Sequence, residues 1–136
     1  MRTVVALGLL AVLLAGCGAS APRDSSKKFK GDQQKVAAVV ESLETAARDN
    51  KPNDVCGKLF TAGRLKLLKQ QGTNCKTGVK EAFSDADTLD LTVKSVAITG
   101  TSAVATIVSG TGSKQETDKL DLLRSGTTWQ IDSLGS

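Results

Sequence analysis

Apolar and polar positions divide the chain into three segments of different periodicity. Residues 4–14 form an apolar run of 11 residues without a polar side chain. Residues 18–31 are mostly small or polar and show no apolar repeat. From residue 32 onward, apolar side chains recur first at helical spacing and then in alternation. The pattern predicts a leader (1–16), a flexible tether (17–31) and one folded domain (32–136).

The first 16 residues have the composition of a cleaved signal peptide. Arg2 is their only charged residue, and Ala15 and Gly16 are the small residues that a signal peptidase needs near the cut. A membrane-spanning helix requires about 20 apolar residues, which is longer than this run. The alternative, a buried helix of a cytosolic domain, would carry polar residues on its outer face, and this run has none. We therefore expect residues 1–16 to be removed.

The stretch Leu14-Ala15-Gly16-Cys17 resembles the processing site of bacterial lipoproteins. In such proteins the cysteine sulfur receives a diacylglyceryl group with acyl chains such as palmitate, and a peptidase then cuts just before the cysteine. The resemblance implies that Cys17 is the lipid attachment site and the first residue of the mature chain. It also implies a location at the cell membrane, lipid-anchored on the extracytoplasmic face of the cell envelope, with membrane lipid as a partner through Cys17.

The tether carries a basic cluster, Lys27, Lys28 and Lys30, close to the predicted anchor. As a flexible coil, this segment would hold the domain on the order of 20 Å from the bilayer. Each lysine near an anionic surface contributes about 1 kcal/mol of attraction. We expect this membrane-proximal cluster to touch anionic headgroups. The alternative is a charge run that only keeps the tether solvated.

Charge is unevenly distributed between the two halves of the mature chain. Residues 23–80 hold 13 Lys and Arg against 6 Asp and Glu, whereas residues 81–136 hold 4 against 8. A basic half can indicate a nucleic-acid partner, but recognition of single strands needs aromatic stacking platforms. The chain has only 3 Phe, 1 Trp and no Tyr. We therefore predict no nucleic-acid partner. We expect a preferred orientation with the helical half toward the membrane, and the alternative is that the basic half is only a solvated surface.

The cysteines predict a disulfide. With Cys17 lipidated, Cys56 and Cys75 remain as an even pair in an oxidising compartment. A zinc site would need further ligands, but the chain has no histidine and two thiolates do not complete a tetrahedral shell. The wide separation of the two cysteines disfavours a redox motif. We expect a structural bond between Cys56 and Cys75, no metal and no other cofactor.

Helical periodicity extends from residue 33 to residue 49. Its apolar face holds Val36, Val39, Val40, Leu43, Ala46 and Ala47, and its polar face holds Lys35, Glu41, Glu44 and Arg48. Asp32 is the predicted N-cap. A short second helix follows from residue 55, Thr61 caps a third helix that stops at Gly72, and Cys75 opens a fourth. The disulfide would link the second helix to the start of the fourth.

After residue 88 the period changes from helical to alternating. The parity of the apolar positions shifts between Val93 and Val96, which predicts a β-bulge near Lys94 and Ser95. Turns at 99–102, 110–113 and 125–126 separate further strands at 103–109, 120–122 and 129–131. Helices followed by an antiparallel meander predict an α+β domain, with the N-terminal helices packed on a curved antiparallel sheet of three to four strands.

Three strand stretches carry a further resemblance: Val96-Ala97-Ile98, Ala103-Val104-Ala105-Thr106 and Thr128-Trp129-Gln130-Ile131-Asp132. With these stretches and this order of elements, residues 32–134 resemble the nuclear transport factor 2-like (cystatin-like) superfamily, in the form of small actinobacterial lipoproteins. The resemblance implies a cone, a curved sheet wrapped around the long helix, whose interior holds a ligand or is filled by side chains. Enzymes of the superfamily commonly place Asp, His or Tyr inside the cone, and this chain has no His and no Tyr.

Candidate chemistry in the domain therefore rests on carboxylates. Asp85, Asp87 and Asp90 cluster at the helix-to-strand junction, where paired carboxylates would do acid–base work if burial separated their pKa values. The alternative is that turn geometry alone favours Asp there. We predict no catalytic residue and a non-catalytic binding or interaction module for an apolar ligand or an envelope protein. A structural lipoprotein with a filled core and a carboxylate-based enzyme stay open as alternatives, as does the oligomeric state.

Overall fold

The computed structural model describes residues 24–85, 89–110 and 112–135. Cys17 and the predicted signal peptide lie outside these residues. The helical elements are η1 (Ser26–Lys28), α1 (Gly31–Arg48), α2 (Pro52–Asp54), η2 (Val55–Leu59), α3 (Ala62–Gln70) and α4 (Cys75–Asp85). The strands are β1 (Leu91–Thr99), β2 (Ser102–Ser109), β3 (Glu116–Ser125) and β4 (Thr128–Leu134).

α1 is the long amphipathic helix that the sequence predicts, but Asp32 does not cap it. The helix begins at Gly31, one residue before Asp32, so that Asp32 lies in the first turn. There the Asp32 carboxylate accepts hydrogen bonds from Lys35 at 3.0 Å and from Arg124 of β3 at 2.8 Å. These two cations, Lys35 first, hold the pKa of Asp32 below its usual range. Asp32 therefore links the start of α1 to the sheet.

The short helices agree with their predicted starts and stops in two places. Thr61 caps α3, because its Oγ1 accepts a hydrogen bond of 3.0 Å from the Arg64 N–H. Gly72, with φ +73, follows the end of α3 in the left-handed conformation that favours glycine. The second helix differs from the prediction, because α2 is a single turn that continues into the π-helical turn η2.

The four strands form one antiparallel sheet in the order β1-β2-β3-β4, as predicted. The register of β1 against β2 shifts between Val93 and Ser95, which confirms the bulge and returns Val96 to the buried face. β3 begins at Glu116, earlier than predicted, because its first four residues pair with β2 although all four are exposed. They lack the apolar alternation from which a strand is predicted.

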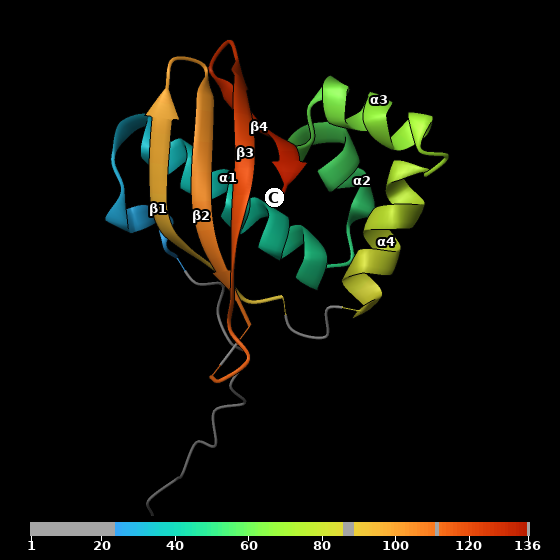
Figure 1. Ribbon diagram of the computed structural model, residues 1–136, viewed down its shortest axis with the longest axis horizontal. Coiled ribbons are helices and arrows are strands. Elements are labelled where there is room, and N and C mark those ends of the chain that lie inside the picture. The colour runs from blue at the N-terminus through green and yellow to red at the C-terminus, as the bar shows by residue number, and fades with distance from the viewer. Residues whose placement is uncertain (1–23, 86–88, 111, 136) are drawn as a thin grey trace, which may run out of the picture.

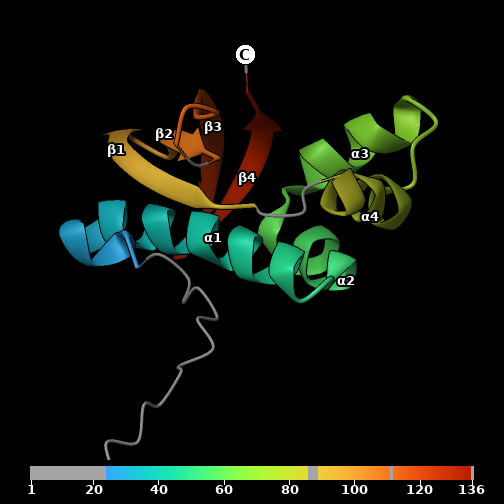
Figure 2. The same ribbon diagram turned by 90° about the horizontal axis from the view of Figure 1, so that it is seen from below.

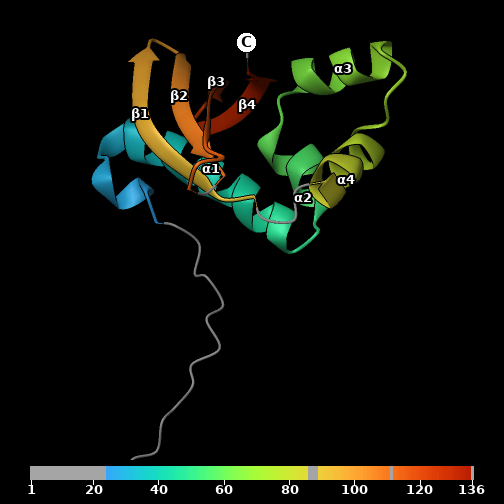
Figure 3. The same cartoon turned by 60° about the horizontal axis from the view of Figure 1, so that its bottom comes forward.

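α1 crosses the concave face of the sheet, and α3 and α4 lie beyond the β4 edge (Figures 1 and 2). Figure 3 shows the same separation, with η1 on the β1 side and α3 and α4 at the opposite end of the molecule. The core lies between α1 and the sheet and includes the fully buried side chains of Val36, Val40, Leu122 and Ile131. The result is an open α+β cone, as predicted.

Residues 24–31, which the sequence analysis assigned to the tether, are packed on the domain. The Ser26 N–H donates to Glu41 of α1 at 2.6 Å, and the Ser25 hydroxyl accepts a hydrogen bond from the Val93 N–H at 3.4 Å. Both serines are buried, and Phe29 packs against the core. The prediction of a flexible tether up to residue 31 is therefore wrong for these residues. Their polar composition conceals contacts with α1 and β1.

Candidate functional site

An apolar hollow of about 310 Å³ lies between the C-terminal half of α1 and one end of the sheet. Antiparallel pairing brings the start of β1, the end of β2, the start of β3 and the end of β4 to this same end. Leucine and isoleucine supply most of the wall, with Leu43 from α1 and Leu89, Leu91, Ile107, Leu120 and Leu134 from the sheet side. The volume is at the lower end of the range for small-molecule sites.

The rim of the hollow carries few polar groups. Ser109 and Asp118 are the polar side chains of its lining, and Asp118 is exposed to solvent. Leu134 is 43% exposed although it lines the hollow, so an apolar side chain is left facing solvent at the opening. Such a site can bind an apolar group by burying it, and the Asp118 carboxylate disfavours a negatively charged ligand.

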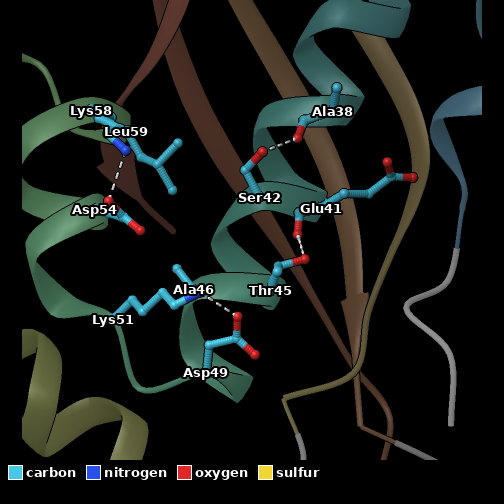
Figure 4. Close-up of a pocket in the computed structure, with 10 residues that line it drawn as sticks. All are labelled: Ala38, Glu41, Ser42, Thr45, Ala46, Asp49, Lys51, Asp54, Lys58 and Leu59. Carbon is cyan, nitrogen blue, oxygen red and sulfur yellow. Dashed lines mark hydrogen bonds and ion pairs between the residues drawn. The ribbon is translucent and has the colours of Figure 1, made fainter.

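A larger but more polar groove, of about 510 Å³, lies between α1 and the α2–η2 segment. Figure 4 shows two ion pairs among its charged side chains, Lys51 with Asp49 at 2.7 Å and Lys58 with Asp54 at 2.9 Å. The Glu41 carboxylate accepts from the Ser26 N–H instead. The Ser42 and Thr45 hydroxyls donate to backbone carbonyls of their own helix. Because these polar groups already have partners, the groove is a weaker candidate for ligand binding than the hollow.

Glu44 is fully buried on the face of α1 that packs against the sheet, which corrects its predicted place on the polar face. Its Oε1 accepts a hydrogen bond of 2.5 Å from Arg48, and the backbone N–H of Leu91 in β1 lies near the carboxylate. Burial raises the pKa of Glu44 and nearby Asp90 adds to the rise, while Arg48 and the Leu91 N–H oppose it. Among the described residues, Glu44 Oε2 is buried without a hydrogen-bond partner.

The predicted carboxylate cluster is described only in part. Asp85 is the last residue of α4, Asp87 lies outside the described residues, and Asp90 is half-buried close to Glu44. Neither Glu44 nor Asp90 lines the hollow. The sequence analysis missed Glu44 as a buried acid, although its spacing of four from Val40 places it on the apolar stripe of the helix.

Cys56 and Cys75 form the predicted pair, with a distance of 6.1 Å between their Cα atoms and a bond between their sulfurs. Cys56 lies in η2 and Cys75 opens α4, so the bond clips these two elements together. Cys56 is buried in the core and Cys75 packs against it.

The predicted membrane-proximal cluster of Lys27, Lys28 and Lys30 is exposed in and next to η1. Lys27 forms an ion pair with Asp24, which lowers the pKa of Asp24 and raises that of Lys27.

No helix within the described ranges is both long and apolar enough to cross a membrane. The described residues also contain no group of three or more His, Cys, Asp or Glu side chains that would hold a metal ion.

Comparison with known proteins bears on the fold alone. No protein-family model matches the chain, and no curated protein matches it significantly. Among solved structures, a de novo designed NTF2 fold protein, NT-9, is similar over 77% of this chain and 87% of its own, with 13% identity and a TM-score of 0.51. The cone of helices on a curved antiparallel sheet therefore defines the class of fold. The fold is of the nuclear transport factor 2-like type, in agreement with the fold that the sequence resemblance implies.

Proposed function

We propose that the protein is a lipid-anchored extracytoplasmic binding module that holds a small apolar ligand in the hollow between α1 and the sheet. The observation that carries the ligand proposal is the hollow itself, because most of its wall is Leu and Ile and one of its leucines faces solvent. The anchor proposal rests on the sequence around Cys17. Neither proposal needs a catalytic residue.

A solution experiment with a neutral fluorescent probe tests the ligand proposal. Phenylnaphthylamine should bind saturably to the protein with increased fluorescence. Leu134→Asp places a charge at the opening and removes an apolar contact worth roughly 1.5 kcal/mol, so the affinity should fall about tenfold. Leu67→Asp is the matched control, because Leu67 on α3 has the same 43% exposure but lies away from the hollow. Equal effects of the two substitutions would contradict the proposal.

The charge of Asp118 at the rim of the hollow allows a second test, with an anionic probe. Anilinonaphthalene sulfonate, an anionic probe of similar size, should bind more weakly than phenylnaphthylamine because of the Asp118 carboxylate. Asp118→Asn should narrow the difference between the two probes. Ser109→Phe would fill the hollow with a phenyl ring and abolish binding of both probes without altering the core.

The anchor proposal has its own test. Mass spectrometry of the protein from native membranes should find an acylated N-terminal Cys17, and Cys17→Ala should leave an unprocessed precursor. A chain that starts at Met1 and carries no lipid in the membrane fraction would overturn it.

A structural lipoprotein is the second candidate function, favoured by the packing of the cone interior. Val36, Val40, Leu122 and Ile131 fill its centre with fully buried side chains, and the hollow opens only at one end. If the neutral probe shows no saturable binding to a protein that is folded by circular dichroism, the structural function is preferred. The carboxylate-based enzyme is supported less well, because the buried Glu44 is separate from the hollow.

A further inference from the structure

The residues from η2 into the first half of α4 carry only positive charge, and Glu81 and Asp85 follow in the second half of α4. Residues 55–80 contain six basic side chains and no Asp or Glu. The basic side chains are Lys58, Arg64, Lys66, Lys69, Lys76 and Lys80. Lys58 pairs with Asp54, but the four lysines of α3 and α4 form no ion pair within the described residues. Their charge is therefore available to an outside partner.

The surface of α3 is open to such a partner. None of its residues is fully buried, and only Arg64, Leu65 and Leu68 are half-buried, on the side that faces the rest of the molecule. Lys66, Leu67 and Lys69 are exposed, and the exposed fraction of Leu67 is 43%. The outward surface of α3 thus combines cations with an apolar side chain.

Three contacts hold this surface in a fixed position. The disulfide from Cys56 to Cys75 ties η2 to α4. The Thr61 hydroxyl, at the start of α3, donates a hydrogen bond of 2.6 Å to Asp132 of β4, and the Thr61 N–H donates to the Ile131 carbonyl at 3.0 Å. A surface held in this way loses little conformational entropy when it binds.

We infer that α3 and α4 form a docking surface for an anionic lipid bilayer, with Lys66, Lys69, Lys76 and Lys80 attracting the headgroups and Leu67 entering the interface. An anionic bilayer fits both parts of the surface, because it attracts lysines and accepts apolar side chains. A single-stranded nucleic acid fits it less well, since base stacking needs exposed aromatic rings. Phe60 and Trp129 are buried, and Phe29 and Phe83 are half-buried.

The position of this surface gives the domain a definite orientation. η1 and the N-terminal side lie at one end of the molecule, and α3 and α4 lie at the other (Figures 1 and 3). The chain from Cys17 to Asp24 can reach about 25 Å at most. A domain anchored at one end and docked at the other therefore lies along the membrane. Lys27, Lys28 and Lys30 remain a predicted second contact at the anchored end.

The inference rests on the proposed lipid anchor for its location in the cell, but it is tested without the anchor. The chain from Gly18 to Ser136 contains every residue of the core, so it keeps the fold described above. Its binding is measured by cosedimentation with vesicles of phosphatidylcholine alone and of phosphatidylcholine mixed with phosphatidylglycerol. If the chain fails to bind these vesicles, the proposals for the lipidation of Cys17 and for ligand binding in the hollow are unaffected. If either of those proposals fails, the vesicle-binding result is likewise unaffected.

The chain should bind the anionic vesicles and leave them as salt rises, because the Debye length shortens to about 8 Å at physiological ionic strength. Lys66→Gln with Lys69→Gln should weaken binding by about 30-fold, at roughly 1 kcal/mol for each lysine. Lys94→Gln with Lys119→Gln is the matched control, because it removes the same charge from exposed positions of the sheet. The control should change binding only slightly.

Leu67→Ala separates the apolar contribution from the charge. It should weaken binding several-fold without altering the dependence on salt, because leucine acts by burial. Both double variants should keep the melting temperature of the parent chain. The inference would be overturned if the two double variants had equal effects or if the chain bound neutral and anionic vesicles equally. Equally tight binding to a single-stranded oligonucleotide would also overturn it.

Discussion

Glu44 accepts a hydrogen bond from Arg48 while it is held among the apolar side chains of α1, close to the first N–H of β1. A buried carboxylate is destabilised in its charged form, and its partners only partly compensate. Arg48 and the Leu91 N–H favour the charged form, whereas burial, Asp90 and Glu41 favour the neutral form and prevail, so that the pKa of Glu44 is raised. The folded state therefore binds a proton more readily at this position than the unfolded chain does.

This proton linkage predicts a pH-dependent difference between the wild type and Glu44→Gln. Because the folded-state pKa is raised above the unfolded value of about 4.5, the contribution of Glu44 to stability is greatest below that value and is lost as pH rises through the folded pKa. The unfolding free energy of the wild type minus that of Glu44→Gln should therefore fall with rising pH. Urea unfolding across the acid-to-neutral range measures it. Glu81→Gln, which removes an exposed carboxylate, is the control, and a difference that rises with pH would contradict the assignment.

Gly110 and Gly112 offer a matched pair in the turn between β2 and β3. Both have a positive φ, +80 and +62, but a Cβ at Gly110 would lie 2.3 Å from the Lys114 carbonyl oxygen, whereas at Gly112 it would meet open space. Gly112→Ala should cost about 1 kcal/mol for the left-handed conformation alone. Gly110→Ala should cost clearly more, because the backbone of the turn has to move. Chemical unfolding measures both, and equal costs would show that the turn opens freely.

At the scale of elements, η2 and α4 depend on the bond between Cys56 and Cys75. Closing a loop of this length stabilises a folded chain by about 3 kcal/mol on the loop-entropy estimate. Cys56→Ala should lower the unfolding free energy by about that amount. Cys75→Ala and the double variant should match it, because all three remove the same bond. Non-reducing peptide mapping of the native protein is the direct check, and finding both thiols free would contradict the bond.

Elements with a local signal could be predicted from the sequence. The parity shift between Val93 and Val96 located the bulge, and the hydroxyl of Thr61 located the start of α3, because each signal lies within a few residues of its effect. Glu44 was misplaced because a charged side chain was assigned to solvent by its chemistry rather than by its helical position. Its neighbours Asp90 and Leu91 are far away in sequence, so no local pattern places them beside Glu44.

The candidate site was beyond sequence reasoning for the same reason. Leu89 lies just before β1, Leu91 begins it and Leu134 ends β4, and only the register of the four strands brings them to one hollow. Whether the cone interior is filled or open depends on how side chains from distant elements fit together. A hydrophobic pattern states which faces are buried, but it does not state how completely they fill the space between them.

For the whole molecule, both edges of the sheet are covered by segments that precede it in the chain. On the β4 side, Phe60 pairs with Ile131, and Gln130 donates to the Lys58 and Phe60 carbonyls. On the β1 side the cover comes from side chains. Ser25 accepts from the Val93 N–H, and Gln33 donates to the Val96 carbonyl at 2.8 Å. Uncovered strand edges pair with other chains, so these contacts also disfavour self-association.

Because residues before α1 contact the edge of β1, we predict that the folded unit begins before Asp32. A chain that starts at Asp32, the boundary expected from sequence, lacks Ser25 and Phe29 and leaves the Val93 N–H without its partner. Losing that partner and the packing of Phe29 should cost about 2–4 kcal/mol. The freed edge should also promote dimers or larger species. A chain that starts at Gly18 is the control and should melt higher. Calorimetry and light scattering on both chains measure the two effects, and equal melting temperatures would show that the segment before α1 is only a tether.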